Sequence, residues 1–580
     1  MAERSAEQDL SPLFPSAARF ARTAEGAAMS LLPGAAVNCG VFPAGRYVQR
    51  QNAPKECLMK QRMALFLFSL LVLVPLVHVF GTGIMEARNL ISAQSMALDG
   101  DWLIPHLYTE IRLNKPPLPV WLTVPVFLLD SDPSPLALHI PVILVTALLG
   151  VFCFDLHRLL CGESRANFYA GLVSASMLMT IKLGTANSWD IYSVVFMTGS
   201  LAAMLQTGRG WLAAGTLCMA ASILSKGPVQ LYTMLLPFLL ASLLFRRAVP
   251  WRRLAFILIG GGLLGSLWYL YVWLAVPHVA EVVARGEVSA WSNRHTAPFW
   301  FYLSFPAFAG AWALPALAGL GGRRISRGEE ADEWANHKFL LCWFGLSLLL
   351  LSLVPEKKER YMMPALVPYA LQTAVVLRYW VRGLKEGSLT RLERNIVRVH
   401  IGAGTLAAAG ICGFIAYSHQ TFLAYALLFA LLALLIGRYG LKRPERVVPV
   451  TCLLLFCAVF AAFRMGSARP VVQSIAPTCS LEELHRLPQM AGLPFYSLDG
   501  ISPVEEWEVG RDITCVSAPS DIPEQRFVLV DTDTTPPGFL REGGEFGILE
   551  RILVQTTDNK YLTLFLLERR QPAPPAGRGA

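Results

Sequence analysis

Long apolar segments recur along this chain from Arg62 to Arg464, and they limit the environment in which it can fold. Each segment is roughly 20 residues long, which is the length of helix that crosses a hydrocarbon layer of about 30 Å. Only 16% of the 580 residues are charged, whereas an ordinary soluble domain has about 25%. The sequence therefore excludes a soluble enzyme and predicts a mainly α-helical polytopic membrane protein.

Thirteen membrane-spanning helices are predicted from these segments. Their ranges are 62–82, 136–156, 166–182, 188–206, 210–225, 228–245, 254–275, 299–321, 337–354, 361–379, 398–417, 421–437 and 447–464. Because the number is odd, the two ends of the chain are expected on opposite sides of the membrane.

Basic residues concentrate in short loops of one parity, and this indicates the orientation. Examples are Arg158 and Arg165 in one loop and Arg246 and Arg247 in another. Positively charged loops stay in the cytoplasm, so the net charge of +9 is read as a topology signal and not as a nucleic-acid surface. We expect a cytoplasmic N-terminus, with the loop 83–135 and everything after about residue 465 on the outer side.

Composition divides the chain into domains. Residues 1–58 are rich in Ala, Pro, Arg and Gly, and they are expected to be disordered or to reflect a mis-assigned start codon. Residues 466–570 alternate apolar and polar positions, which is typical of strands, and predict a small periplasmic α/β domain. The predicted parts are 1–58, a transmembrane catalytic domain at 59–465, the α/β domain at 466–570, and a disordered tail at 571–580.

Five basic residues sit at helix ends or turns on the predicted outer side, where the topology rule disfavours positive charge. They are Lys115, Lys226, Lys357, Lys358 and Arg360. Any one of them could reach lipid phosphates or solvent. As a set they favour an anionic ligand, since a phosphate about 4 Å from one cation gains about 4 kcal/mol at an effective dielectric of 20.

The first outer loop, 83–135, holds the richest set of reactive side chains. Glu86 and Arg88 lie where a membrane helix meets water. A carboxylate there can act as a general base, while Arg88 and Lys115 can hold a phosphate leaving group. A local ion pair between Glu86 and Arg88 is the plainer alternative.

The motifs and their order resemble the membrane-embedded GT-C glycosyltransferases. The resemblance is to the bacterial family that contains the lipid A aminoarabinose transferases, which is related to the dolichyl-phosphate-mannose protein mannosyltransferases. It covers residues 62–370. The matching segments are Glu86-Ala-Arg88-Asn89, Gly100-Asp101-Trp102, Lys115-Pro116-Pro117-Leu118, Asp190, Lys226-Gly227-Pro228, Ala297-Pro298-Phe299-Trp300 and Lys358-Glu359-Arg360-Tyr361.

The resemblance implies a multi-pass protein of the bacterial inner membrane that transfers a sugar on the periplasmic face. The donor would be a sugar on a polyprenyl phosphate such as undecaprenyl phosphate. The acceptor hydroxyl would belong to lipid A, another glycolipid or a protein. The acceptor oxygen would attack the anomeric carbon with inversion and expel the lipid phosphate. The expected partners are this donor, the acceptor and membrane lipids, with no nucleic acid, and the protein is expected to be a monomer.

The resemblance also implies roles for particular residues. Met85 replaces the Asp of the family's Asp-Glu pair, so the base would be Glu86, with Asp101 or Asp190 as rivals. The residues expected at the donor phosphate are Arg88, Lys115, Lys226, Lys358 and Arg360. Those expected at the sugar or acceptor are Asp190, Trp102 and Trp300. An N-cap for Asp190 and interfacial anchoring for the tryptophans are the alternatives.

Neither a metal site nor a cofactor is predicted. In the aminoarabinose transferases an acidic residue before the Lys-Pro-Pro run helps to bind a metal, and here that position is Asn114. The alternative function is a transporter or flippase of lipid-linked saccharides. Such proteins often have internal repeats, and none is visible in this chain.

Overall fold

The structure, a computed structural model, describes most of residues 55–466 and 484–570. The residues within these ranges that it does not describe are 78, 80, 109, 294, 322–330, 419–422, 485–486, 491, 499, 533–536, 538–539, 541–544 and 556–560. Most of the predicted N-terminal extension and all of the predicted tail lie outside the described residues.

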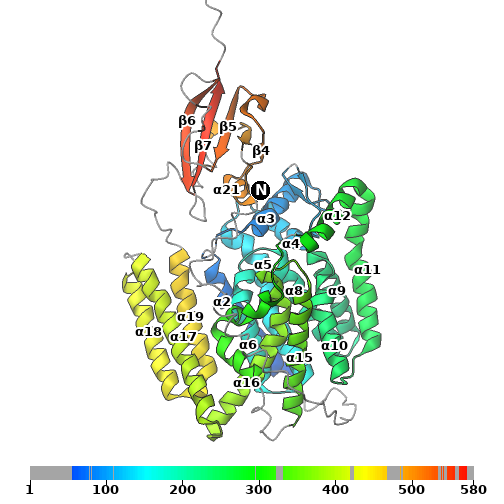
Figure 1. Cartoon of the computed structure of the whole chain (residues 1–580), viewed down its shortest axis with the longest axis vertical. Helices are drawn as coiled ribbons and strands as arrows, with labels where there is room; N and C mark the ends of the chain where they lie inside the picture. Colours follow the sequence, from blue (N-terminus) through cyan, green and yellow to red (C-terminus); the bar gives the residue numbers. More distant parts are fainter. Residues whose placement is uncertain are drawn as a thin grey trace, which may run out of the picture.

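The described chain is mainly helical and ends in a sheet (Figure 1). The elements are α2 (Lys55–Leu73), η3 (Val74–Leu76), α3 (Ile84–Asp99), β1 (His106–Leu107), β2 (Glu110–Ile111), α4 (Leu118–Leu129), α5 (Pro135–Cys161), α6 (Arg165–Ser176), α7 (Leu178–Gly184), α8 (Trp189–Leu205), α9 (Arg209–Lys226), η4 (Leu231–Leu235), α10 (Leu236–Leu244), α11 (Trp251–Ala275), α12 (Pro277–Asn293), η5 (Phe299–Ser304), α13 (Phe305–Phe308), η6 (Gly310–Trp312), α14 (Ala313–Leu320), α15 (Ala331–Leu353), η8 (Glu359–Met362), α16 (Met363–Glu386), α17 (Arg391–Ser418), α18 (Leu423–Lys442), η10 (Pro444–Arg446), α19 (Val447–Gly466), η11 (Pro488–Met490), β3 (Phe495–Ser497), α21 (Pro503–Val509), β4 (Ile513–Cys515), η12 (Pro519–Asp521), β5 (Arg526–Asp531), β6 (Phe546–Gln555) and β7 (Tyr561–Arg569).

Seven helices in the described part of the chain are long and apolar enough to cross a membrane, or eight if one bent pair counts as a span. The protein is therefore a multi-pass membrane protein, as predicted. The count of thirteen crossings is not confirmed, because several predicted spans contain shorter or broken helices. The span predicted at 166–182, for example, divides into α6 and α7 at Met177, whose backbone is extended.

Two predicted spans differ clearly from the structure. The first helix begins at Lys55 and not at 62, because a charged turn with a Lys60–Glu56 pair at 2.7 Å continues the helix beyond the apolar run. The span predicted at 299–321 bends by 93° between Phe308 and Gly310. Gly310 has φ +58°, and a Cβ there would lie 2.9 Å from Cβ of Leu178, so a side chain is excluded at this bend.

The central helices α5, α6, α8 and α16 bury much of their side-chain surface, whereas the outer helices present leucines to their surroundings. Leu263 and Leu274 on α11 and Leu406 on α17 are highly exposed. Lipid tails are as apolar as leucine, so such side chains lose nothing by facing the bilayer.

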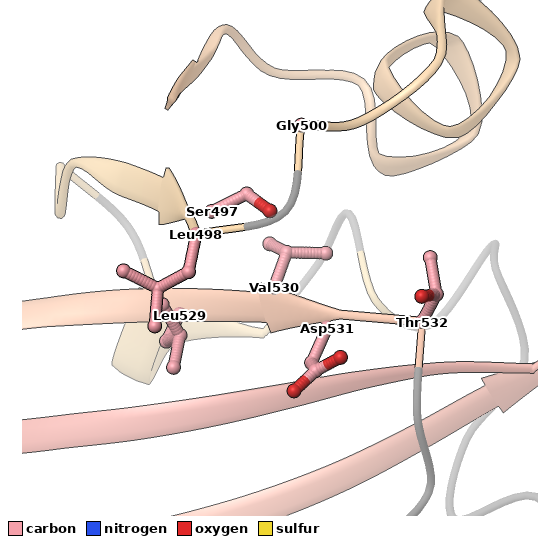
Figure 2. Close-up of a pocket in the computed structure, with 7 residues that line it drawn as sticks. All are labelled: Ser497, Leu498, Gly500, Leu529, Val530, Asp531 and Thr532. Carbon is pink, nitrogen blue, oxygen red and sulfur yellow. The ribbon is translucent and has the colours of Figure 1, made fainter. Parts of the chain in front are cut away.

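The C-terminal region forms the predicted small α/β domain. Its five strands have the order β4-β3-β5-β7-β6, in which β3 pairs in parallel with β4 and β5 and the remaining pairs are antiparallel. Apolar side chains cover both faces, with Val528 on one side and Phe527 on the other. A small pocket lies at the carboxyl ends of the parallel strands β3 and β5 (Figure 2).

The sheet domain lies at the same end of the molecule as α3, α4 and α12 (Figure 1). Its helix α21 packs against α3. This arrangement places the first predicted outer loop between the helical bundle and the C-terminal domain.

Candidate active site

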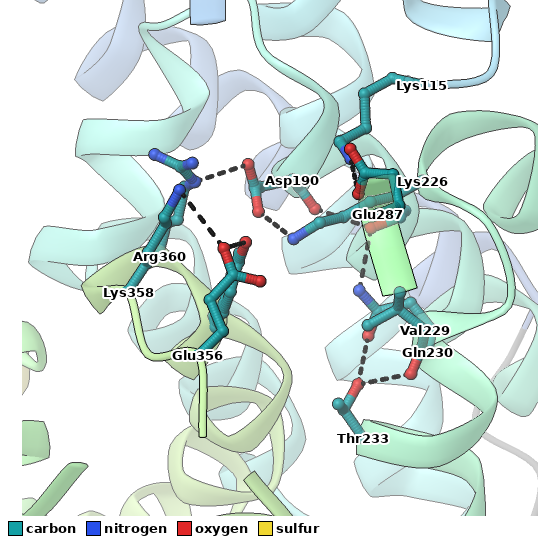
Figure 3. Close-up of polar contacts among 12 residues, drawn as sticks. Lys115, Asp190, Lys226, Val229, Gln230, Thr233, Glu287, Glu356, Lys358 and Arg360 are labelled. Carbon is teal, nitrogen blue, oxygen red and sulfur yellow. Dashed lines mark hydrogen bonds and ion pairs between the residues drawn. The ribbon is translucent and has the colours of Figure 1, made fainter. Parts of the chain in front are cut away.

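A cluster of charged side chains occupies the end of the bundle nearest the sheet domain, and Asp190 is its centre. Asp190 lies in the first turn of α8 and is only 3% exposed. One carboxylate oxygen, Oδ1, contacts the ammonium of Lys226, and Oδ2 lies 3.4 Å from Nε of Arg360 (Figure 3). The N-cap of α8 is Ser188, so Asp190 is not a helix cap.

Backbone geometry places Lys226 beside Asp190. Lys226 is the last residue of α9, which packs along α8. The chain then turns at Gly227, which has φ +79°, a conformation that favours glycine. The ammonium of Lys226 also lies 4.2 Å from the ring centroid of Tyr361, and the guanidinium of Arg360 lies 5.7 Å from the same ring. Tyr361 thus holds both cations by cation–π contacts.

Lys115 approaches the same region from the first loop. Its ammonium lies 3.1 Å from Oε2 of Glu287, on α12. It is also close enough to act electrostatically on both Asp190 and Lys226. Three segments far apart in the sequence therefore bring cations to one place.

The two other lysines of the predicted outer set, Lys357 and Lys358, are in the loop before η8. The ammonium of Lys358 lies 3.5 Å from Oε1 of the buried Glu356. Lys357 instead donates to the carbonyl oxygen of Val354 at 2.7 Å. Backbone bonds join this loop to the segment at His295, whose carbonyl accepts from the N–H of Lys357 at 3.1 Å.

Glu86 lies in an environment different from that expected of a solvent-facing base. It is 4% exposed, and its Oε1 accepts a hydrogen bond from the backbone N–H of Asn187 at 3.1 Å. Nε2 of His139 lies 2.5 Å from the same oxygen. Nδ1 of His139 faces the carbonyl of Pro135 at 2.5 Å, so this nitrogen must carry a proton. Glu86 therefore faces the interior of the bundle.

The other predicted residues are Asp101, Trp102 and Arg88 in the first loop and Trp300 in η5. Oδ1 of Asp101 accepts from the backbone N–H groups of Leu103 and Ile104, at 3.1 and 3.2 Å, and so closes a turn. Trp102 and Trp300 are exposed. Arg88 lies on α3, near enough to Arg112 for the two charges to interact.

Arg112 is a residue that the sequence reasoning missed. It is buried, and its guanidinium lies 4.7 Å from the ring centroid of Trp189. The pKa of Arg112 is lowered to about 9, mainly by burial and also by the positive charge of Arg88, while Glu287 opposes the shift. Its position in the predicted outer loop was the available signal, the same one that identified the other cations.

The contacts of Asn114 and Lys115 do not favour a divalent cation beside them. The amide of Asn114 donates to Oε1 of Glu287 at 3.3 Å, while the ammonium of Lys115 holds the other oxygen. The amide oxygen of Asn114 could be a ligand, but the ammonium of Lys115 is a donor that occupies the carboxylate of Glu287 and repels a cation. Within the described ranges, no three His, Cys, Asp or Glu side chains are grouped so that they could hold a metal.

Comparison with known proteins identifies the class to which this fold corresponds. A family described as "Dolichyl-phosphate-mannose-protein mannosyltransferase" matches residues 114–265, the segment that contains Lys115, Asp190 and Lys226. The crystal structure of ArnT from Cupriavidus metallidurans bound to undecaprenyl phosphate has a TM-score of 0.66 at 16% identity, over 88% of this chain and 97% of that one. The protein therefore has the fold of a GT-C membrane glycosyltransferase.

Particular relatives are the undecaprenyl phosphate-α-4-amino-4-deoxy-L-arabinose arabinosyl transferases. The enzyme of Pectobacterium atrosepticum is 25% identical over 507 residues, which are 80% of this chain and 86% of that protein. That of Pseudomonas aeruginosa strain PAO1 is 30% identical over 374 residues, 60% of this chain and 64% of that protein. The match to the Pectobacterium carotovorum enzyme likewise spans 64% of the relative's length. The predicted resemblance is confirmed.

Proposed function

We propose that this protein is an integral membrane glycosyltransferase that moves a sugar from a polyprenyl-phosphate donor to a lipid hydroxyl. The supporting observation is the convergence of Lys115, Lys226 and Arg360 around Asp190 at one end of the helices. A phosphate joined to a lipid in the bilayer would reach this end with its head group. The similar ArnT structure is bound to undecaprenyl phosphate, and the sequence relatives are named for the same lipid. We therefore propose undecaprenyl phosphate as the carrier and the periplasmic face of the bacterial inner membrane as the location.

The reaction uses the cations to stabilise the leaving group. The acceptor oxygen forms a bond to the anomeric carbon, the bond from that carbon to the phosphate oxygen breaks, and the acceptor proton passes to a carboxylate. Negative charge develops on the departing phosphate, where preorganised cations are most effective. Lys115, Lys226 and Arg360 would supply this stabilisation, with Arg88 and Lys358 at the edge of the site.

Asp190 has the geometry that best supports a carboxylate role in the reaction. Of the three candidates, Glu86 faces the core and Asp101 closes a turn, whereas Asp190 touches two of the cations. When a donor phosphate takes over Lys226 and Arg360, the carboxylate of Asp190 is released to bind the sugar or accept a proton. Glu86 and Asp101 would then support the structure around the site and would not contact the reacting groups.

The substrate class follows from the relatives. The curated proteins that match are named for transfer of 4-amino-4-deoxy-L-arabinose from undecaprenyl phosphate. We propose an amino sugar of this kind as the first donor to test and lipid A as the first acceptor. The charged cluster lies at one end of the helices and not along a path through them, which favours a transferase over the transporter alternative.

The test is transfer by purified full-length protein in lipid nanodiscs, with undecaprenyl-phosphate aminoarabinose as donor and lipid A as acceptor. Lys226→Ala should lower the rate by roughly 100-fold or more, the usual effect of removing one charge-stabilising group. Lys115→Ala and Glu86→Gln should also lose activity. Lys357→Ala is the matched control, because this lysine is bonded to a main-chain carbonyl and should leave the rate unchanged. A Lys226→Ala variant with the wild-type rate would contradict the site.

A further inference from the structure

Asn187 is a completely buried residue in the turn between α7 and α8, and no sequence motif pointed to it. Its side-chain amide uses its full hydrogen-bonding capacity. Oδ1 accepts from Nδ2 of Asn89 and from the hydroxyl of Tyr192, both at 2.9 Å. Nδ2 donates to Oγ1 of Thr123 at 3.0 Å and to the carbonyl of Leu138 at 2.9 Å.

The backbone of Asn187 takes part in the same network. Its N–H donates to Glu86 at 3.1 Å, and its carbonyl accepts from Nδ2 of Asn89 at 3.0 Å. The partners belong to α3, α4, α5 and α8, so one residue joins four helices. Hydrogen bonds in such a dry environment are costly to leave unmade, and the turn is therefore held in one conformation.

The residues that follow Asn187 carry this fixed geometry into the charged cluster. The indole N–H of Trp189 donates to the carbonyl of Pro116 at 2.9 Å, immediately beside Lys115 in the chain. Asp190, the next residue, contacts Lys226 and Arg360. The turn thus connects the two arms of the proposed phosphate site, one in the first loop and one on α8 and α9.

We infer that Asn187 is a positioning residue of the donor-phosphate site, and that Glu86 and His139 act through it. The buried Glu86–His139 pair holds the N–H of Asn187, and the turn then sets the spacing between Lys115 and the Asp190–Lys226 pair. This inference rests on the proposed function and adds to it. It explains why Glu86 faces inward, since its carboxylate supports the turn and does not meet the acceptor.

The test is a double-mutant cycle on binding of undecaprenyl phosphate to the full-length protein in nanodiscs. Tyr192→Phe removes one hydroxyl that donates to Asn187 and leaves no large cavity. In the wild-type background it should weaken binding about fivefold, the effect of roughly one hydrogen bond. In a Lys226→Ala background, where the positioned cation is absent, Tyr192→Phe should have no further effect.

The matched control is Tyr425→Phe, on α18. This change also removes one hydroxyl hydrogen bond, which Tyr425 donates to the carbonyl of Phe460 at 2.8 Å. It should leave binding unchanged. Asn187→Asp, which places an acceptor where Leu138 and Thr123 need a donor, should weaken binding more than Tyr192→Phe. Unchanged binding in Tyr192→Phe, or an equal loss in both backgrounds, would overturn the inference alone. Wild-type protein with no saturable binding would overturn the proposed function as well.

Discussion

The indole ring of Trp507, on α21 of the C-terminal domain, packs edge-on against the phenyl ring of Phe127 at the end of α4. The ring centroids are 6.2 Å apart and the planes meet at 82°. Nearby, the hydroxyl of Tyr108 donates to the backbone carbonyl of Glu506 at 3.3 Å. The C-terminal domain therefore contacts the loop that carries Arg88 and Lys115, and it can influence the order of that loop.

Trp507→Ala should loosen this contact. An aromatic pair contributes about 1 kcal/mol beyond the area that it buries, so local opening should become several-fold more frequent. Hydrogen–deuterium exchange should rise in α21 and in the strands β1 and β2. The control is Trp211→Ala, which removes an exposed tryptophan on α9. Unchanged exchange in α21 of Trp507→Ala would show that the ring contact does not hold the domains together.

The same contact should depend on pH through Glu506. The pKa of Glu506 is raised to about 7, mainly by burial and also by the carboxylates of Asp512, Glu110 and Glu505, while Arg88 opposes the shift. A raised pKa in the folded state means that the protonated form is favoured there, so docking is strongest below the ordinary pKa near 4.5 and weakens as the pH rises through about 7.

Tryptophan fluorescence and hydrogen exchange of α21 between pH 5 and 8.5 would measure this weakening. Glu506→Gln should remove most of the pH dependence and keep the contact closed at high pH. If Glu506→Gln and the wild type respond equally to pH, another group is responsible.

Asp190→Asn should expose the role of the charged cluster. Removing the carboxylate leaves Lys226 and Arg360 without their shared counter-charge, and breaking a buried pair costs about 3–5 kcal/mol. The melting temperature without ligand should fall. Undecaprenyl phosphate should then raise it more than in the wild type, because the phosphate replaces the missing charge. Asp132→Asn, an exposed change in the first loop, is the control. A smaller ligand effect in Asp190→Asn would contradict a phosphate at this position.

Glu287→Gln should strengthen binding of the donor phosphate. Glu287 competes with the phosphate for the ammonium of Lys115. Because the Glu287–Lys115 pair is partly exposed, it contributes at most about 1 kcal/mol. Its loss should therefore improve the affinity for the phosphate by roughly two- to fivefold. Glu281→Gln on the same helix is the control, because Glu281 pairs with Arg285. Isothermal titration in nanodiscs would measure both. Weaker binding in Glu287→Gln would mean that Glu287 orients Lys115 and does not compete with the phosphate.

The multi-pass architecture and the small C-terminal α/β domain could be predicted from the sequence alone, and the outer placement of the basic residues stays a prediction. Each depends on local properties: the length of an apolar run, the alternation of side chains, or the parity of a charged loop. The same local reasoning failed for 299–321, because composition does not show a bend imposed by the close approach of Gly310 to Leu178.

Only the tertiary structure decided which of the predicted residues meet. Arg360 reaches Asp190 from a distant segment, Glu86 faces the core, and Asn187 joins four helices. Burial and hydrogen-bond partners arise from packing between elements far apart in the chain, and spacing along the sequence carries no record of them. The sequence by itself determined the class of protein and the inventory of charges, whereas packing determined which carboxylate lies among the cations.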